Sequence, residues 1–314
     1  MKYRSLGRTS VDVSVIGFGL WTLSTPGWGL QSSDVGVLLL REAYDNGVTL
    51  YDTSDLYGRG DSEILLNRAL GDHRHNIIIS TKMGFDFYSP KLHTGSTVSK
   101  NFRPEYITHA CEKSLTRLKT DYLDLYGLHY PGLSDIETDE VFEALEELFD
   151  EGKILSYSVA IDDTPDAQEA VNILIGDRGI PTLHFPFNIL EHDLFDHISS
   201  NPDEKIPGLL VRRPHCYGFL DSTQEITGRS KDMTIEEGCS EHIYKLLKRA
   251  EVLSDIDELN EMRIEEVALR FILDNPTISS VIPNFRNLNQ VYDYCLVAEM
   301  PPLSHSLHNK LSKL

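Results

Sequence analysis

Eight apolar runs, separated by stretches with helical spacing, constrain the fold of this chain more than any other feature. They lie near residues 13–19, 49–54, 77–83, 122–129, 154–160, 182–188, 208–214 and 279–285. Most are rich in apolar residues, as strands that are buried on both faces must be. Apolar positions at three- and four-residue steps predict helices between them, for example over 104–118, 141–149 and 264–272. This alternation predicts an α/β fold, a single (β/α)8 barrel domain over residues 1–314.

Two segments outside the predicted strands and helices have features of their own. The first 12 residues alternate between polar and apolar and contain Gly7-Arg8-Thr9, which predicts a short hairpin covering one mouth of the barrel. The longest irregular region, residues 221–239, predicts a surface loop after the seventh strand. A flap over a bound cofactor and a plain insertion are both consistent with that loop.

Composition restricts the partners of the chain. The net charge of −20 and the pI near 4.9 argue against nucleic acid and against an anionic membrane. No stretch resembles a membrane span, and the first residues do not resemble a secretory signal, so we expect a cytoplasmic protein. The four cysteines, Cys111, Cys216, Cys239 and Cys295, lack metal-ligand spacing and are expected to be unpaired in a reducing compartment.

Four side chains at the ends of three predicted strands form a set suited to proton transfer. They are a carboxylate (Asp52), a phenol (Tyr57), an ammonium (Lys82) and an imidazole (His129). A phenol with a pKa of about 10 donates a proton slowly at neutral pH unless its phenolate is stabilised. A nearby ammonium favours the phenolate, and a carboxylate keeps that ammonium charged and in place. In a barrel, strand ends of this kind meet at one mouth.

The segments around these residues resemble the aldo-keto reductase superfamily. Residues 51–63 (YDTSDLYGRGDSE) are similar to its D-T-A-x-x-Y-G-x-G-x-S-E signature, and residues 120–129 (TDYLDLYGLH) to its T-D-Y-I-D-L-Y-x-x-H segment. Shorter matches extend the resemblance over about residues 3–298: Ser80-Thr81-Lys82, Glu151-Gly152-Lys153 and Val281-Ile282-Pro283. The resemblance implies a (β/α)8 barrel and NADPH-dependent reduction of a small-molecule aldehyde or ketone, with no metal.

The resemblance also implies a role for each member of the set. Tyr57 is expected to act as the general acid, with Lys82 lowering its pKa and Asp52 pairing with Lys82. His129 is expected to orient the substrate carbonyl. The hydride chemistry would belong to the cofactor, and the protein would supply placement and electrostatics.

Candidate cofactor residues lie near the first and the last strands. No GxGxxG follows a predicted strand, so a Rossmann site lacks its main support. By resemblance, Gly19 approaches the nicotinamide, and Arg212 stacks on it or instead pairs with an acidic residue. Arg286 is the candidate for the ribose 2′-phosphate near a helix N-terminus, and hence for NADP(H), while Gln290 matches a position that meets adenine.

The chain departs from the family pattern where the nicotinamide carboxamide is usually held. Ala160 and Ile161 replace Ser and Asn, and their side chains cannot form hydrogen bonds, whereas His184 replaces Gln and keeps one. At the adenine end, Tyr294 stands in place of Asn. Each lost contact would cost roughly 0.5–1.5 kcal/mol of cofactor affinity. This departure motivates a second function, a nucleotide-binding sensor or regulatory subunit with slow or no turnover.

Aromatic residues on the predicted loops are candidates for the substrate pocket. Trp21 and Phe85 are the named candidates, and Trp28, Phe87 and Tyr88 lie nearby in the sequence. An aromatic pocket and ordinary lids over the barrel mouth fit these residues equally well. The substrate itself, the reaction direction and the oligomeric state stay open at this point.

Overall fold

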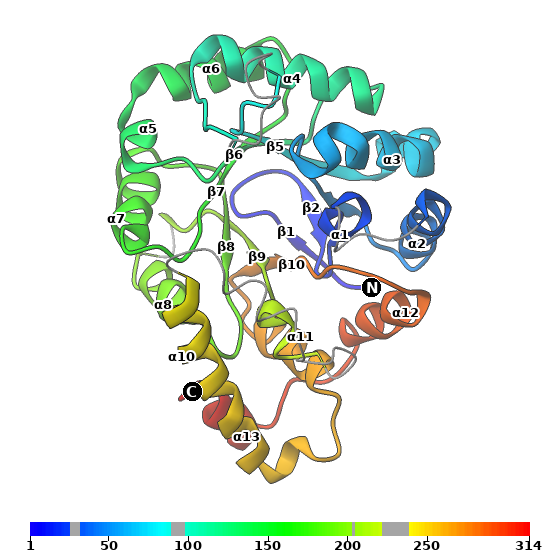
Figure 1. The fold of residues 1–314 in the computed structure, drawn as a ribbon, viewed down its shortest axis with the longest axis vertical. Helices are drawn as coiled ribbons and strands as arrows, with labels where there is room; N and C mark the ends of the chain where they lie inside the picture. Colours follow the sequence, from blue (N-terminus) through cyan, green and yellow to red (C-terminus); the bar gives the residue numbers. More distant parts are fainter. Residues whose placement is uncertain (26–31, 89–97, 203–204, 222–238) are drawn as a thin grey trace.

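A closed ring of parallel strands forms the centre of the protein in the computed structural model, which describes residues 1–25, 32–88, 98–202, 205–221 and 239–314 (Figure 1). Sheet order follows chain order from β3 to β10, and every neighbouring pair is parallel. Bridges from Ile16 to Val281 and from Gly19 to Asn284 join the last strand to the first. The strands are β3 Phe18–Gly19, β4 Leu50–Asp52, β5 Ile78–Met83, β6 Leu125–His129, β7 Tyr157–Ala160, β8 Thr182–Pro186, β9 Gly208–Arg212 and β10 Ile278–Val281. The predicted (β/α)8 barrel is confirmed.

Helices surround the strands, as Figure 1 shows. Those that follow the strands use the predicted apolar stripes, and α4 begins at Pro104 as expected. The main helices are α2 Ser33–Asp45, α3 Asp61–Leu70, α4 Pro104–Leu118, α6 Asp139–Asp150, α7 Ala167–Val171, α8 Asp193–Ser199, α10 Cys239–Val252, α11 Ile264–Leu273, α12 Leu288–Val297 and α13 His305–Leu311. Short helices α1 Trp21–Ser24 and α5 Leu133–Glu137 lie in loops.

The predicted N-terminal hairpin is confirmed, but it takes part of the first predicted strand. Strands β1 (Tyr3–Ser5) and β2 (Asp12–Ser14) pair antiparallel, so only Phe18–Gly19 of the 13–19 run enters the barrel. At this division the Ser14 hydroxyl accepts hydrogen bonds from the backbone N–H groups of Thr49 and Leu50, so the end of the hairpin contacts the start of β4 through a side chain. Arg4 fixes the hairpin to the mouth where the barrel strands begin, donating to the carbonyl of Ile278 at 2.7 Å.

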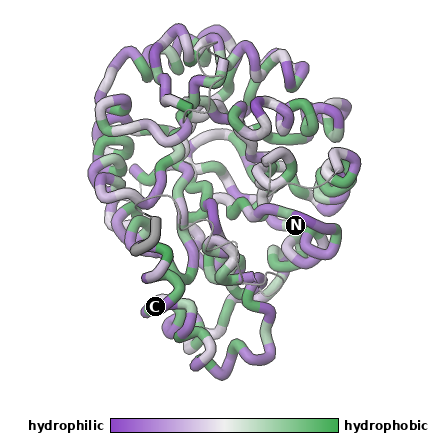
Figure 2. Tube along the Cα trace, viewed as in Figure 1, coloured by the Kyte–Doolittle hydropathy of each residue, from purple (hydrophilic) through white to green (hydrophobic). Residues whose placement is uncertain are grey.

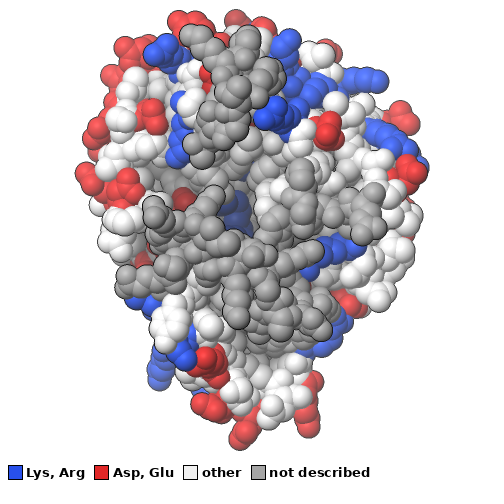
Figure 3. All heavy atoms as spheres, viewed as in Figure 1, with Lys and Arg blue, Asp and Glu red and all other residues white. Residues whose placement is uncertain are grey.

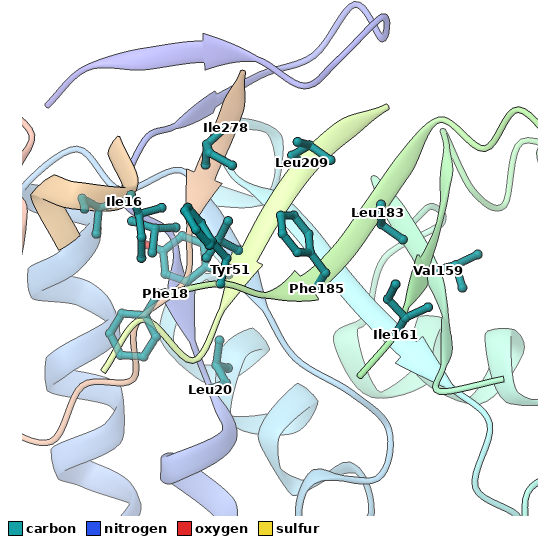
Figure 4. Close-up of a cluster of buried hydrophobic side chains, with 14 of the residues drawn as sticks. Ile16, Phe18, Leu20, Tyr51, Val159, Ile161, Leu183, Phe185, Leu209 and Ile278 are labelled. Carbon is teal, nitrogen blue, oxygen red and sulfur yellow. The ribbon is translucent and has the colours of Figure 1, made fainter. Parts of the chain in front are cut away.

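Apolar side chains fill the ring and the layer between strands and helices. Figure 4 shows Phe18, Tyr51, Phe185 and Leu209 within this core, and Phe18 stacks on Phe285 with ring centroids 4.4 Å apart. The hydropathy trace in Figure 2 is hydrophobic along much of the strands and hydrophilic along much of the outer surface. Such burial of strands on both faces is the pattern that the eight apolar runs predicted.

The remaining sequence predictions concern loop residues, the cysteines and membrane-spanning helices. Trp28 and nearly all of the predicted loop at 221–239 lie outside the described residues. Cys111, Cys216 and Cys295 are buried and free, as expected. In the described part of the chain, we find no helix with the length and apolar character to cross a bilayer.

Candidate active site

An ion pair lies at the carboxyl ends of two neighbouring strands. Lys82 of β5 donates from Nζ to Asp52 Oδ1 of β4 at 2.6 Å and to the Thr53 carbonyl at 2.9 Å. The Ser80 hydroxyl donates to the same carboxylate oxygen at 2.7 Å. Burial lowers the pKa of Lys82, while Asp52 opposes that change, so the carboxylate favours the charged ammonium inside the barrel.

Tyr57 reaches the same mouth through a tight turn after β4. Residues Tyr57–Gly60 form this turn, and both Gly58 and Gly60 have positive φ, which glycine adopts at little cost. A Cβ at Gly58 would come within 2.9 Å of the Ser24 carbonyl oxygen. The two glycines of the signature are therefore required by the turn that places Tyr57.

His129 ends β6 and is held by Ser54. The Ser54 hydroxyl lies 3.0 Å from His129 Nδ1, so Nε2 is the ring nitrogen available toward the mouth. Burial lowers the pKa of His129 well below its usual value, and the charges of Lys82 and Arg212 lower it further. The imidazole is therefore neutral at physiological pH and able to donate or accept a hydrogen bond.

One cavity of about 410 Å³ opens at this mouth, and the candidate residues share it. Its wall includes Gly19, Trp21, Asp52, Tyr57, His129, Arg212 and Arg286. Figure 3 shows basic side chains in the central hollow of this view. The described wall carries three Arg and three Asp side chains, so it is less acidic than the whole sequence, in which acidic residues outnumber basic ones by 49 to 29.

The Tyr57 phenol is protonated in this environment. Burial raises its pKa well above the usual value, and the charges of Tyr130 and Asp52 add to that effect, whereas Arg212 opposes it. Tyr57 and His129 lie edge to face, with ring centroids 5.9 Å apart. A proton donor and a neutral imidazole thus face the same cavity.

Arg212 ends β9 beside this pair and contacts Tyr130. Its guanidinium donates to the Tyr130 hydroxyl and to the Ile161 carbonyl oxygen at 2.5 Å, and its Cζ lies 4.9 Å from the centroid of the Tyr130 ring. Of the two options that the sequence left open for Arg212, no ion pair with an acidic side chain is found among the described residues. Its Nε is buried and has no hydrogen-bond partner in the part of the chain that the structure describes.

At the other end of the cavity lies Arg286, just before α12. Its guanidinium is 3.9 Å from Asp221, and its backbone N–H donates to Gln290 Oε1 at 2.8 Å. Gln290 is buried and outside the cavity wall that the described residues form. Its side chain therefore fixes the turn that carries Arg286, and a direct contact between Gln290 and adenine stays a prediction.

The three departing positions lie side by side, Ala160 and Ile161 at the end of β7 and His184 in the middle of β8. Ala160 pairs with His184 in the ladder, and the Ile161 N–H donates to the His184 carbonyl oxygen at 2.9 Å. His184 is fully buried, and neither ring nitrogen has a hydrogen-bond partner in the described part of the chain. Burial lowers the pKa of His184, and Lys82 and Arg212 add to this.

The two named aromatic candidates occupy different places. Trp21 lines the cavity, whereas Phe85 packs edge to face on His129 with ring centroids 5.4 Å apart. Phe85 therefore contacts the imidazole but is not part of the cavity wall that the described residues form. Its contact with a substrate stays a prediction.

Sequence reasoning missed several residues of the wall. Tyr130, Arg213, Cys216 and Tyr217 line the cavity and share a positive φ that is unusual for residues other than glycine. Such conformations cluster at functional sites, where surrounding contacts hold them. The sequence could have indicated these residues only by their position, because each follows the end of a barrel strand.

The family of the chain follows from comparison with known proteins. Residues 15–314 match the family model described as Aldo/keto reductase family. The chain belongs to this family. Membership identifies an oxidoreductase that acts on small-molecule carbonyl groups, and it favours an enzyme over a sensor or regulatory subunit.

Individual relatives agree with this assignment. Aldo-keto reductase YhdN of Bacillus subtilis (strain 168) is 29% identical over 293 residues, which cover 88% of this chain and 82% of the relative. Aldo-keto reductase AKR11C1 from Bacillus halodurans, in its holo form, superposes with a TM-score of 0.80 at 24% identity over 100% of this chain and 96% of that one. The glycerol dehydrogenase AKR11B4 from Gluconobacter oxydans gives a TM-score of 0.78 at 23% identity, over 99% and 94%. The two structures establish likeness of fold.

Proposed function

We propose that this aldo/keto reductase reduces a small aldehyde or ketone with NADPH, using Tyr57 as the general acid. One observation carries the proposal: Tyr57 and His129 line the same cavity, and the Asp52 carboxylate in its wall holds the Lys82 ammonium. A protonated phenol, a neutral imidazole and a buried cation are the groups needed to polarise and protonate a carbonyl oxygen.

Groups at the mouth fit a nicotinamide dinucleotide. Arg212 lines the cavity, and its Nε, which has no hydrogen-bond partner among the described residues, is available to a polar ring with a carboxamide. Arg286, at the far end of the cavity, offers a cation for phosphate next to the N-terminus of α12. When bound, the cofactor would supply the two electrons and one hydrogen of the reduction.

The proton steps belong to the protein. His129 Nε2 would donate to the carbonyl oxygen and orient it, and Tyr57 Oη would then transfer its proton to that oxygen. The phenolate left on Tyr57 needs a nearby cation. Arg212 already opposes the rise in the Tyr57 pKa, and stabilisation of the phenolate by Lys82 stays a prediction from the family resemblance.

Turnover tests this proposal directly. NADPH absorbance would be followed with a panel of small aldehydes, ketones and keto sugars, and NADPH binding would be measured separately by fluorescence. We expect NADPH consumption with at least one carbonyl. Tight NADPH binding with no consumption on any of them would contradict the proposal and favour a sensor.

Arg286 provides a test of cofactor preference. Its guanidinium lines the cavity, and among the described residues its acidic neighbour is Asp221 at 3.9 Å, so a ribose 2′-phosphate would be a better partner. We expect Arg286→Ala to raise the dissociation constant of NADPH by about tenfold to a hundredfold and that of NADH by much less. Arg68→Ala, which removes an exposed ion pair with Asp34, is the matched control. Equal effects of Arg286→Ala on the two cofactors would refute the phosphate assignment.

A further inference from the structure

His184 lies against the ion pair of the site, and no described residue forms a hydrogen bond with its ring. Its Nδ1 is 3.6 Å from Asp52 Oδ1, the oxygen that already accepts from Lys82 and Ser80. The side chain is fully buried on β8. Buried polar groups are nearly always partnered, so a histidine in this position calls for an explanation.

The protonation of the ring follows from its neighbours. Lys82 and Arg212 are the nearby cations, and burial together with their charges keeps the imidazole neutral, with a single N–H. An ionised carboxylate can only accept. A bare Nδ1 would turn a lone pair toward Asp52, whereas a protonated Nδ1 would turn a donor toward it. The second arrangement is electrostatically favoured, and it leaves Nε2 as an acceptor.

We propose that His184 is a positioning residue for Asp52, holding the carboxylate through Nδ1–H in the orientation that keeps Lys82 in place. Its effect on catalysis rests on the proposed function, because the ion pair matters there for proton transfer. Nε2 has no partner among the described residues and remains free to accept a hydrogen bond.

Two amide substitutions separate the two ring nitrogens. The amide nitrogen of Asn is one bond from Cγ, as Nδ1 is, whereas that of Gln extends further, toward the position of Nε2. His184→Asn therefore keeps a donor for Asp52, and His184→Gln keeps a polar group near the position of Nε2. His184→Phe preserves much of the ring volume and removes both nitrogens.

Steady-state kinetics distinguish the roles. We expect His184→Asn to keep kcat within about threefold of the parent, and His184→Gln and His184→Phe to lower kcat by about tenfold or more. Thermal unfolding of each variant would show that it folds. The proposal would be overturned if His184→Gln retained kcat while His184→Asn lost it. It would also be overturned if kcat fell equally in all three variants or fell in none.

Nitrogen NMR of histidine-labelled protein tests the contact without turnover or cofactor. We expect the His184 signals, assigned with His184→Gln, to report a protonated Nδ1 and a bare Nε2. Asp52→Asn should shift these signals and leave those of the distant His73 unchanged. A protonated Nε2, or no response to Asp52→Asn, would overturn the proposal. An Nδ1–H signal in a protein without turnover would contradict the proposed function alone.

Discussion

At the scale of single residues, the site depends on a lysine that burial alone would neutralise. Lys82 is 1% exposed, and desolvation lowers its pKa, because a charge inside the barrel has lost its water. Asp52 counteracts this by a direct hydrogen bond and by its charge. The cation is therefore maintained by a single carboxylate whose own orientation depends on its neighbours.

Asp52→Asn tests this dependence through pH. Without the carboxylate, the pKa of Lys82 should fall further, so that the charged form persists only at lower pH. We expect kcat at neutral pH to fall by about tenfold to a hundredfold, and the alkaline limb of the kcat profile to move to lower pH. Asp34→Asn, at an exposed ion pair, should leave the profile unchanged. An unshifted alkaline limb in Asp52→Asn would contradict the role given to the pair.

Several residues of the recognised motifs serve the fold instead of the chemistry. Glu63 is buried, accepts from the Thr81 hydroxyl at 2.6 Å and pairs with Arg117 at 2.5 Å, which ties α3 to β5 and α4. Asp124 pairs with Arg74 and accepts from the Ile79 N–H at 2.9 Å. Sequence alone could locate these motifs. It could not distinguish a carboxylate of the proton-transfer site, such as Asp52, from carboxylates that only connect elements of the fold, such as Glu63 and Asp124, because all of them lie near strands.

At the scale of elements, α10 is attached to the loop after β8 by polar contacts. His242 Nε2 lies 3.0 Å from Glu191 Oε1, and Arg249 donates to the Leu190 carbonyl oxygen at 2.6 Å. The hydrogen bond with Glu191 raises the pKa of His242. For Glu191, burial would raise the pKa, but His242, Arg213 and Asn188 outweigh it and lower the pKa.

These shifts predict how the attachment depends on pH. Because the pKa of His242 is raised in the folded protein, its interaction stabilises the fold fully at pH values below the pKa of the unfolded state, and this stabilisation is lost as pH rises through the folded pKa. Because the pKa of Glu191 is lowered, its contribution is present above the unfolded pKa and is lost as pH falls through the folded pKa. We expect His242→Gln to lower the free energy of unfolding by about 1 kcal/mol near pH 6 and by almost nothing near about pH 9, since solvent screens this partly exposed pair.

Denaturant unfolding at the two pH values would measure this effect. His197→Gln is the matched control, because its imidazole contacts the Asn172 amide at 2.9 Å and no carboxylate in the described part of the chain. A His242→Gln effect that is equal at both pH values would show that the pair does not carry the attachment.

Strand ends were the least predictable elements. The predicted run at 208–214 leaves the sheet at Arg212, and the run at 49–54 leaves it at Asp52. Arg213, just beyond the end of β9, lines the cavity and adopts a positive φ. Apolar pattern determines where a strand is buried, but the point of departure depends on tertiary contacts such as the one between Arg213 and Asp162.

At the scale of the whole molecule, the barrel separates stability from chemistry. The hairpin and Arg4 cover the mouth where strands begin, while the cavity lies where strands end. Periodicity predicted the barrel, because eight buried strands and their helices repeat along the chain. It could not show that Gln290 supports the Arg286 turn or that His184 faces Asp52, because both contacts join residues through side-chain orientation.

The central claim is that Tyr57 protonates the carbonyl in this cavity. Its most direct test is kcat for NADPH-dependent reduction by the parent, by Tyr57→Phe, and by the control Tyr292→Phe, which removes a surface hydroxyl bonded to Glu42. We predict that Tyr57→Phe lowers kcat by about 10² to 10⁴ with NADPH binding retained, and that Tyr292→Phe matches the parent. Parent-like turnover in Tyr57→Phe would contradict the claim.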